Sequence, residues 1–101
     1  MFARNVSIHL KSNMLSDYTQ TFEKNVLPLL RQQKGFRDEI TLSNPGSVDV
    51  IAISLWDTRA NAEAYNTNTY PEVLRTLARM IDGTPRFRHL RRLLPPSITS
   101  P

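Results

Sequence analysis

The chain of 101 residues contains no cysteine. A protein without cysteine has no disulfide scaffold, no thiol nucleophile and no cysteine-ligated zinc or iron–sulfur site. No apolar run approaches the ~18–20 residues needed to cross a bilayer. The first residues, Met1 to Asn5, lack the basic and apolar regions of a signal peptide. These absences favour a cytoplasmic protein with no membrane partner.

Glycine is also scarce, with three residues in the whole chain. Gly35 and Gly83 each follow a predicted helix, and Gly46 lies in a predicted turn. No glycine is left for a phosphate-binding loop, so neither a dinucleotide fingerprint nor a P-loop is present. The sequence therefore predicts no NAD, FAD or ATP, and we expect no bound cofactor.

Positive charge is concentrated at the C-terminal end. Residues 83–101 hold four arginines and no acidic residue, whereas residues 1–82 are balanced, which accounts for the net charge of +4. Nucleic-acid binding requires aromatic platforms among such charges, and Phe87 is the one aromatic residue here. We therefore expect a solvated, charged edge strand rather than a nucleic-acid site.

Hydrophobic periodicity predicts alternating strands and helices. Period-two patterns indicate strands at residues 2–11, 36–43, 49–56 and 86–94. A helix is predicted to start at a cap in 12–13 or 16–17, bend at Pro28 and end at Gly35. A second helix is predicted from Asp57 to about Asn66, and it restarts at Tyr70 after the polar run 66–69.

This order, β-α-β-β-α-β with a broken second helix, predicts a ferredoxin-like α+β fold with a four-stranded antiparallel sheet. The domain is expected to cover residues 1–94, and residues 95–101 to form a loose tail. Phe36, Ile40 and Leu42, with Ile51 to Leu55 in alternation, are predicted to face the helices. Val50 and Trp56 then fall on the mixed opposite face, which we expect a second copy of the chain to cover.

Two histidines lie on the first and last predicted strands. His9 and His89 are able to approach each other there, but a metal site needs a third ligand, for which Glu39 is the candidate by parity. We favour two half-exposed strand histidines and no metal. His9 is the better candidate for carrying a proton, because imidazole titrates near neutral pH.

Aromatic and amide side chains gather between the third strand and the last helix: Trp56, Tyr65, Asn66, Asn68 and Tyr70. Small neighbours on the same strand face leave room for a cavity beside the Trp56 indole. Plain core or interface packing explains the same residues equally well. The break between the helices is a suitable pocket mouth, since helix ends leave unpaired backbone donors.

Several segments together resemble the antibiotic-biosynthesis-monooxygenase type of dimeric α+β barrel. They are Ile53–Asp57, Ala62–Tyr65, Tyr70–Leu74, Val26–Arg31 and the Gly35-Phe36 step. The resemblance covers residues 2–94 and implies a homodimer with a pocket between each sheet and its helices. Some members of this superfamily oxidise aromatic polyketides with oxygen and no cofactor, and others degrade haem.

The resemblance implies a candidate site. Trp56, Tyr65 and Arg75 are the expected catalytic residues, with Arg75 stabilising a phenolate or enolate. The expected substrate-binding residues are Asn66, Tyr70 and His9.

The haem-degrading branch fits less well. Tyr65 and Arg75 stand where that branch has tryptophan and histidine, and Val6 stands in place of its asparagine. Arginine has no lone pair with which to ligate iron.

Two hypotheses of different classes follow. The first is a cofactor-independent monooxygenase that oxidises a small aromatic or enolisable substrate with O₂. The second is a non-catalytic, dimeric ligand-binding or stress-responsive domain, and haem degradation is a weaker third. An enzyme needs a titratable or anion-stabilising group in its pocket, whereas a binding domain does not.

Overall fold

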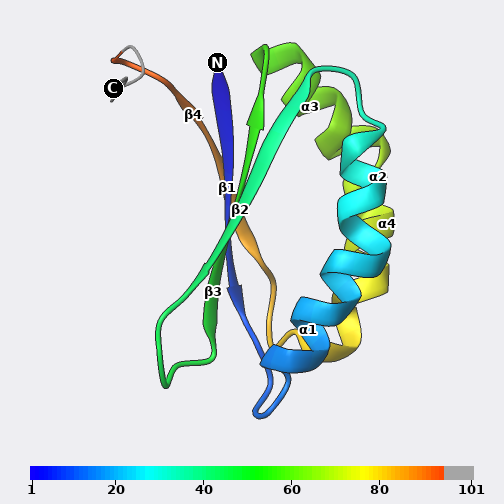
Figure 1. Ribbon diagram of the computed structural model, residues 1–101, viewed down its shortest axis with the longest axis vertical. Coiled ribbons are helices and arrows are strands. Elements are labelled where there is room, and N and C mark those ends of the chain that lie inside the picture. The colour runs from blue at the N-terminus through cyan, green and yellow to red at the C-terminus, as the bar shows by residue number, and fades with distance from the viewer. Residues whose placement is uncertain (95–101) are drawn as a thin grey trace, which may run out of the picture.

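Four antiparallel strands form one sheet in the computed structural model, which describes residues 1–94 (Figure 1). The sheet order is β2-β3-β1-β4, and its strands are β1 (Phe2–His9), β2 (Phe36–Ser43), β3 (Asp49–Trp56) and β4 (Arg86–Arg91). The helical segments cover one face of this sheet. The predicted ferredoxin-like β-α-β-β-α-β fold is therefore confirmed, although β4 ends at Arg91 rather than at residue 94. The predicted tail, residues 95–101, lies outside the described residues.

The first helical segment has three parts. It comprises α1 (Leu15–Thr21), the π-helical turn η1 (Phe22–Val26) and α2 (Leu27–Arg31). The wide turn ends two residues before Pro28, which has no N–H, and the Leu27 N–H bonds to the Phe22 carbonyl five residues back. Neither predicted cap forms, because Met14 occupies the N-cap position and Asn13 adopts a left-handed conformation with φ 62°.

The second helical segment is broken, as predicted. It comprises α3 (Arg59–Asn68), α4 (Tyr70–Leu77) and the 3₁₀ turn η2 (Ala78–Met80). The Thr58 hydroxyl caps α3 by accepting a bond from the Asn61 N–H at 3.1 Å. The break is narrower than predicted, since Thr69 is the one residue between the helices and Pro71 lies in the first turn of α4.

The predicted faces are right for β1 and wrong for β3. Val6 pairs with Ala52 and Ile8 with Val50, and all four are buried under the helices. Ile51, which was predicted to face the helices, is 40% exposed on the open face of the sheet. The error has a simple cause: β3 is apolar on both sides, so alternation alone does not choose between them, and the register with β1 does.

Alternation also predicted the wrong sheet face for the residues of β2 that follow Phe36. The register shifts at Arg37, because Phe36 pairs with Trp56 whereas Asp38 pairs with Leu55. This bulge puts Phe36 against the core but turns Ile40 and Leu42 to the open face. A bulge inserts one residue, so it reverses the parity that the sequence pattern assumes.

Trp56 is a further correction. It was predicted on the face that meets a second subunit, but it is fully buried between the sheet and the helices, at 0% exposure. Ile40, Leu42, Ile51 and Leu90 are the exposed apolar residues of the open face. Among residues 1–94 there is no helix long and apolar enough to cross a membrane.

Candidate functional site

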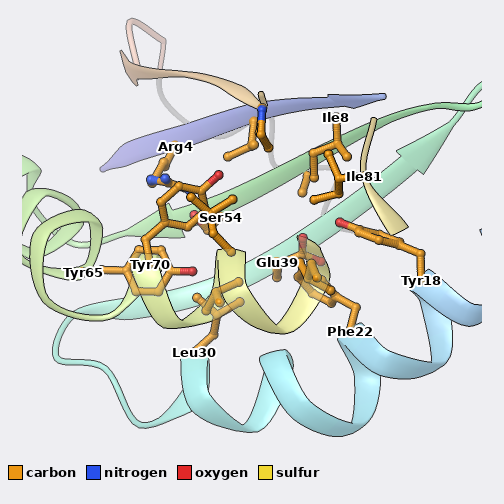
Figure 2. Close-up of a pocket in the computed structure, with 16 residues that line it drawn as sticks. Arg4, Ile8, Tyr18, Phe22, Leu30, Glu39, Ser54, Tyr65, Tyr70 and Ile81 are labelled. Carbon is orange, nitrogen blue, oxygen red and sulfur yellow. The ribbon is translucent and has the colours of Figure 1, made fainter. Parts of the chain in front are cut away.

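A cavity lies between the sheet and both helical segments (Figure 2). Polar groups line it at a few positions: Arg4, Tyr18, Glu39, Ser54, Tyr65 and Tyr70. Apolar side chains make up the rest of its wall. Its free volume is about 30 Å³. A concave apolar space with a few converging polar groups has the composition usual for a small-molecule site. At this volume it holds about one water molecule, so a larger ligand requires its walls to move.

Arg4 dominates one end of this cavity. Its side chain is 2% exposed, and the guanidinium donates a hydrogen bond of 2.7 Å from Nη2 to the Asn66 Oδ1 atom. The guanidinium carbon lies 3.9 Å from the ring centre of Tyr70, 5.3 Å from that of Tyr65 and 4.8 Å from that of Phe87. Aromatic faces attract a cation, so these rings partly replace the lost water.

The Arg4 charge has no carboxylate partner in the described chain. The ion pairs there join His9 to Asp49, Arg37 to Asp57 and Arg59 to Glu63, and none includes Arg4. Its Nε atom is buried without a hydrogen-bond acceptor. Burial lowers the Arg4 pKa, but arginine starts so high that it keeps its charge. The site therefore presents a desolvated positive charge.

Tyr65 and Tyr70 reach Arg4 from opposite sides of the Thr69 break. Their ring centres are 6.1 Å apart. Burial raises the pKa of Tyr65 to about 12, so its hydroxyl stays protonated at neutral pH. The Tyr65 ring therefore meets Arg4 as a neutral aromatic face.

Tyr18 and Glu39 lie away from Arg4, as Figure 2 shows. The Tyr18 side chain is 1% exposed, and its hydroxyl has no hydrogen-bond partner in the described chain. Burial raises the pKa of Tyr18, and the nearby Glu39 charge raises it further. Burial also raises the pKa of Glu39, although the Thr41 hydroxyl donates hydrogen bonds of 2.9 and 2.8 Å to its carboxylate.

Trp56 stands behind the cavity rather than in its wall. The indole N–H donates to the Ser54 hydroxyl at 2.8 Å, and Ser54 itself lines the cavity. The indole ring packs 5.1 Å from the Tyr65 ring and 5.5 Å from the Phe36 ring, centre to centre. Trp56 therefore supports Tyr65 and Ser54 from the core.

The predicted site residues are only partly brought together. Tyr65 and Tyr70 line the cavity, and Asn66 and Trp56 contact residues that line it. Arg75 does not: it is exposed on α4, because α4 buries Val73 and Leu77 on its other side. His9 is also outside, on the open face of the sheet.

The two histidines do not meet either. The His9 Nδ1 atom lies 2.7 Å from the Asp49 carboxylate on the exposed face. His89 pairs instead with Arg4 across β4 and β1, and no group of three metal-ligating residues occurs among residues 1–94.

Three functional candidates went unnoticed in the sequence: Arg4, Tyr18 and, as a cavity residue, Glu39. Arg4 had a readable signal, because it shares the parity of Val6 and Ile8 on a strand whose other even positions are apolar. A charge on a buried face is rare unless it is paired or functional. Glu39 was hidden by the β2 bulge, and Tyr18 was read as an ordinary residue of the helix stripe.

No protein-family model and no curated protein matches this sequence. Solved structures do match. A monooxygenase from the gene ActVA-Orf6 of Streptomyces coelicolor, in complex with Nanaomycin D, superimposes with a TM-score of 0.76 at 14% identity, covering 95% of this chain and 92% of that one.

Two proteins of Nitrosomonas europaea are also similar in structure. One is provisionally named an antibiotic biosynthesis monooxygenase (TM-score 0.76, 16% identity, 93% and 100% of the two chains). The other has no known function (TM-score 0.78, 15% identity, 98% and 95%). Over nearly its full length, the chain therefore has the fold of antibiotic biosynthesis monooxygenase domains.

Proposed function

We propose that the protein is a cofactor-independent monooxygenase that oxidises a small phenolic or enolisable substrate with O₂. The observation that carries this proposal is the buried Arg4 cation, which lines the cavity and has no carboxylate partner among residues 1–94. Reaction of a phenol with oxygen begins from its electron-rich anion. A fixed positive charge in a water-poor cavity stabilises that anion far more than it would in water.

Glu39 is the proposed proton acceptor. Among residues 1–94 it is the one carboxylate that lines the cavity, and burial moves its pKa upward, toward the range suited to a general base. In the proposed reaction Arg4 holds the substrate as its anion, and the ring carbon para to the oxygen gives its electrons to O₂. Glu39, which lies away from Arg4, then takes the proton that this carbon loses as the quinone and water form.

The reaction balances without another reductant. For 1-naphthol, one oxygen atom of O₂ enters the ring at the para carbon and the other leaves as water, so naphthol and O₂ give 1,4-naphthoquinone and H₂O. The substrate supplies all the electrons. The structural neighbour that holds Nanaomycin D supports an aromatic substrate for this fold.

Oxygen consumption tests the proposal. With 1-naphthol or anthrone, the wild-type protein is expected to consume one O₂ per quinone formed. Arg4→Met is expected to lower kcat/KM by about 10²–10³, as loss of an anion-stabilising donor does, and Arg79→Met, at an exposed arginine of η2, serves as the matched control. No oxygen uptake with either substrate rejects the enzyme and favours the binding domain.

A homodimer is the second part of the proposal. The open sheet face carries Ile40, Leu42, Ile51 and Leu90, each at least 40% exposed. An apolar sheet face of this kind is normally covered by another surface. A second copy of the chain supplies such a surface, since a two-fold axis brings the same apolar patch of both copies together. A cytoplasmic location also stays a prediction.

Haem handling gains no support from the cavity. No histidine is among the residues 1–94 that line it. The non-catalytic binding domain remains the alternative. The mostly apolar lining of the cavity is the observation that favours it.

A further inference from the structure

Arg4 is a buried cation whose charge nothing in the described chain neutralises. Its side chain is 2% exposed, it takes part in none of the ion pairs of residues 1–94, and its Nε atom has no hydrogen-bond partner there. Glu39 also lines the cavity, but it lies away from Arg4 (Figure 2). A buried charge is costly unless it is paired. The Arg4 end of the cavity is therefore short of one negative charge.

His89 lies directly opposite Arg4 on the neighbouring strand. The two residues pair across β1 and β4, so they share the helix-facing side of the sheet, with Cβ atoms about 4.5–5.5 Å apart. The His89 Nε2 atom is also buried without a hydrogen-bond partner among residues 1–94. Protonated imidazole donates from this nitrogen and carries a charge. Protonation of His89 therefore adds a second positive charge beside the first.

The space at Arg4 limits what supplies the missing negative charge. The cavity has a free volume of about 30 Å³, enough for one water molecule, and most of its wall is apolar. A water molecule accepts a hydrogen bond from the guanidinium but brings no charge. Chloride is only slightly larger than water, and it brings both an acceptor and a charge. Hydrogen bonds between charged partners are roughly twice as strong as neutral ones.

We propose that the Arg4 end of the cavity binds a small monovalent anion of the size of chloride, held by the Arg4 guanidinium and held more tightly when His89 is protonated. This binding involves no oxidation and is independent of the proposed function. One consequence does rest on the proposed function: the ion competes with the substrate anion for the same guanidinium.

The charges around His89 fix the direction of the pH effect. Burial lowers the pKa of His89 below its ordinary value of 6.5, and the Arg4 charge lowers it further. Arg59 and Glu63 of α3 also act on His89, and these two pair with each other at 2.8 Å. A bound anion offsets the Arg4 charge, so it should raise the pKa of His89 and bind more tightly as the pH falls.

Thermal unfolding in two sodium salts tests the site. Chloride replaces gluconate, a monovalent anion too large for the cavity, at a fixed total concentration, so that the screening of surface charges stays constant. Above the dissociation constant, each tenfold rise in chloride is expected to raise Tm by about 6–11 °C. Arg4→Met should abolish this rise. Arg79→Met removes the same charge from an exposed position of η2 and should retain it.

Proton NMR of the histidines locates the ion in the wild-type protein, so it serves even if Arg4→Met fails to fold. The chain has two histidines, and His9→Asn assigns their signals. His89 should titrate at higher pH in chloride than in gluconate. His9, which lies beside Asp49 on the open face of the sheet, should titrate alike in both salts.

Oxygen uptake measures the competition separately. With 1-naphthol as substrate, chloride is expected to raise KM and to leave kcat unchanged, because the ion and the substrate anion bind the same guanidinium. A KM that is insensitive to chloride in a protein that binds the ion rejects this shared use of Arg4.

The remaining outcomes separate the anion site from the enzyme. Equal Tm values in chloride and gluconate, a chloride effect that survives Arg4→Met, or a His89 titration that is the same in both salts overturns the site. A chloride effect on Tm and His89 without oxygen uptake keeps the site and rejects the monooxygenase. Oxygen uptake without either chloride effect keeps the enzyme and rejects the site.

Discussion

The guanidinium carbon of Arg4 lies 3.9 Å from the centre of the Tyr70 ring. This contact belongs to the site rather than to ordinary core packing, because a buried charge without a counter-charge destabilises a fold. In the proposed reaction, this charge lies where the substrate anion forms.

Replacing Arg4 should therefore separate stability from activity. Arg4→Met fills much of the same space without a charge, so oxygen uptake should fall while the protein stays folded. We expect the free energy of unfolding to be unchanged or to rise by about 1 kcal/mol. For a domain of this size, 1 kcal/mol corresponds to roughly 4–8 °C in Tm. Thermal unfolding beside oxygen uptake measures both, and a large fall in Tm would show that Arg4 is mainly structural.

Gly35 and Gly46 form a matched pair for testing a close approach. Both have φ of +78°, but a Cβ atom at Gly35 would overlap the Asn61 side chain, whereas nothing lies within 4 Å of one at Gly46. Gly46→Ala should cost about 1–2 kcal/mol, the backbone strain alone. Gly35→Ala should cost more.

Urea unfolding of the two variants measures the difference. In the Asn61→Ala background, the extra cost at Gly35 should largely disappear, because the clashing side chain is gone. Equal costs at the two glycines would mean that Asn61 moves aside freely.

Glu39 predicts a pH dependence of stability. Burial raises its pKa in the folded protein above the ordinary value of 4.5. The folded state then binds this proton more tightly than the unfolded state, so the associated stability is present below pH 4.5 and is lost as pH rises through the folded pKa. Glu39→Gln should flatten that decline and stabilise the protein at neutral pH.

Urea midpoints from pH 4 to pH 8 for both proteins check the sign. Asp49 gives the opposite slope, because the hydrogen bond from His9 lowers its pKa. Burial lowers the pKa of His89, which gives that opposite slope as well. The Glu39 contribution is therefore the difference between the midpoints of Glu39→Gln and the wild-type protein, in which the other two groups cancel. A difference that does not grow as pH rises contradicts the assignment.

Two leucines test the proposed dimer. Leu42 is 52% exposed on the open sheet face, and Leu15 is 41% exposed on α1 in the helix layer. Leu42→Glu puts a charge into the proposed interface and should give monomers in sedimentation velocity at micromolar concentration. Leu15→Glu is the matched control and should remain dimeric. A wild-type protein that sediments as a monomer rejects the dimer.

Sequence patterns predicted the order of elements well and the facing of strands poorly. The polar run at Asn66–Thr69 and Pro71 located the helix break, since both features are local. Strand β3 defeated alternation because Ile51 and Val50 are equally apolar, and only pairing across the sheet separates them.

The candidate site was predicted in part for the same reason. Tyr65 and Tyr70 were found because aromatic residues near a helix break are visible in the sequence. The resemblance implied Arg75, whereas Arg4 was overlooked although its parity with Val6 and Ile8 put it on the buried face of its strand. The meeting of Arg4 with Tyr65 and Tyr70 depends on the packing of β1 against the helices, which leaves no local pattern.

The single-residue gap at Thr69 has one more effect. Successive residues of an α-helix turn by ~100°, so positions five apart on an unbroken helix point ~140° away from each other. Tyr65 and Tyr70 are five apart, yet both rings lie against one guanidinium. The kink thus allows both tyrosine rings to contact the same cation. A straight helix with the same sequence would point one of the two rings away from it.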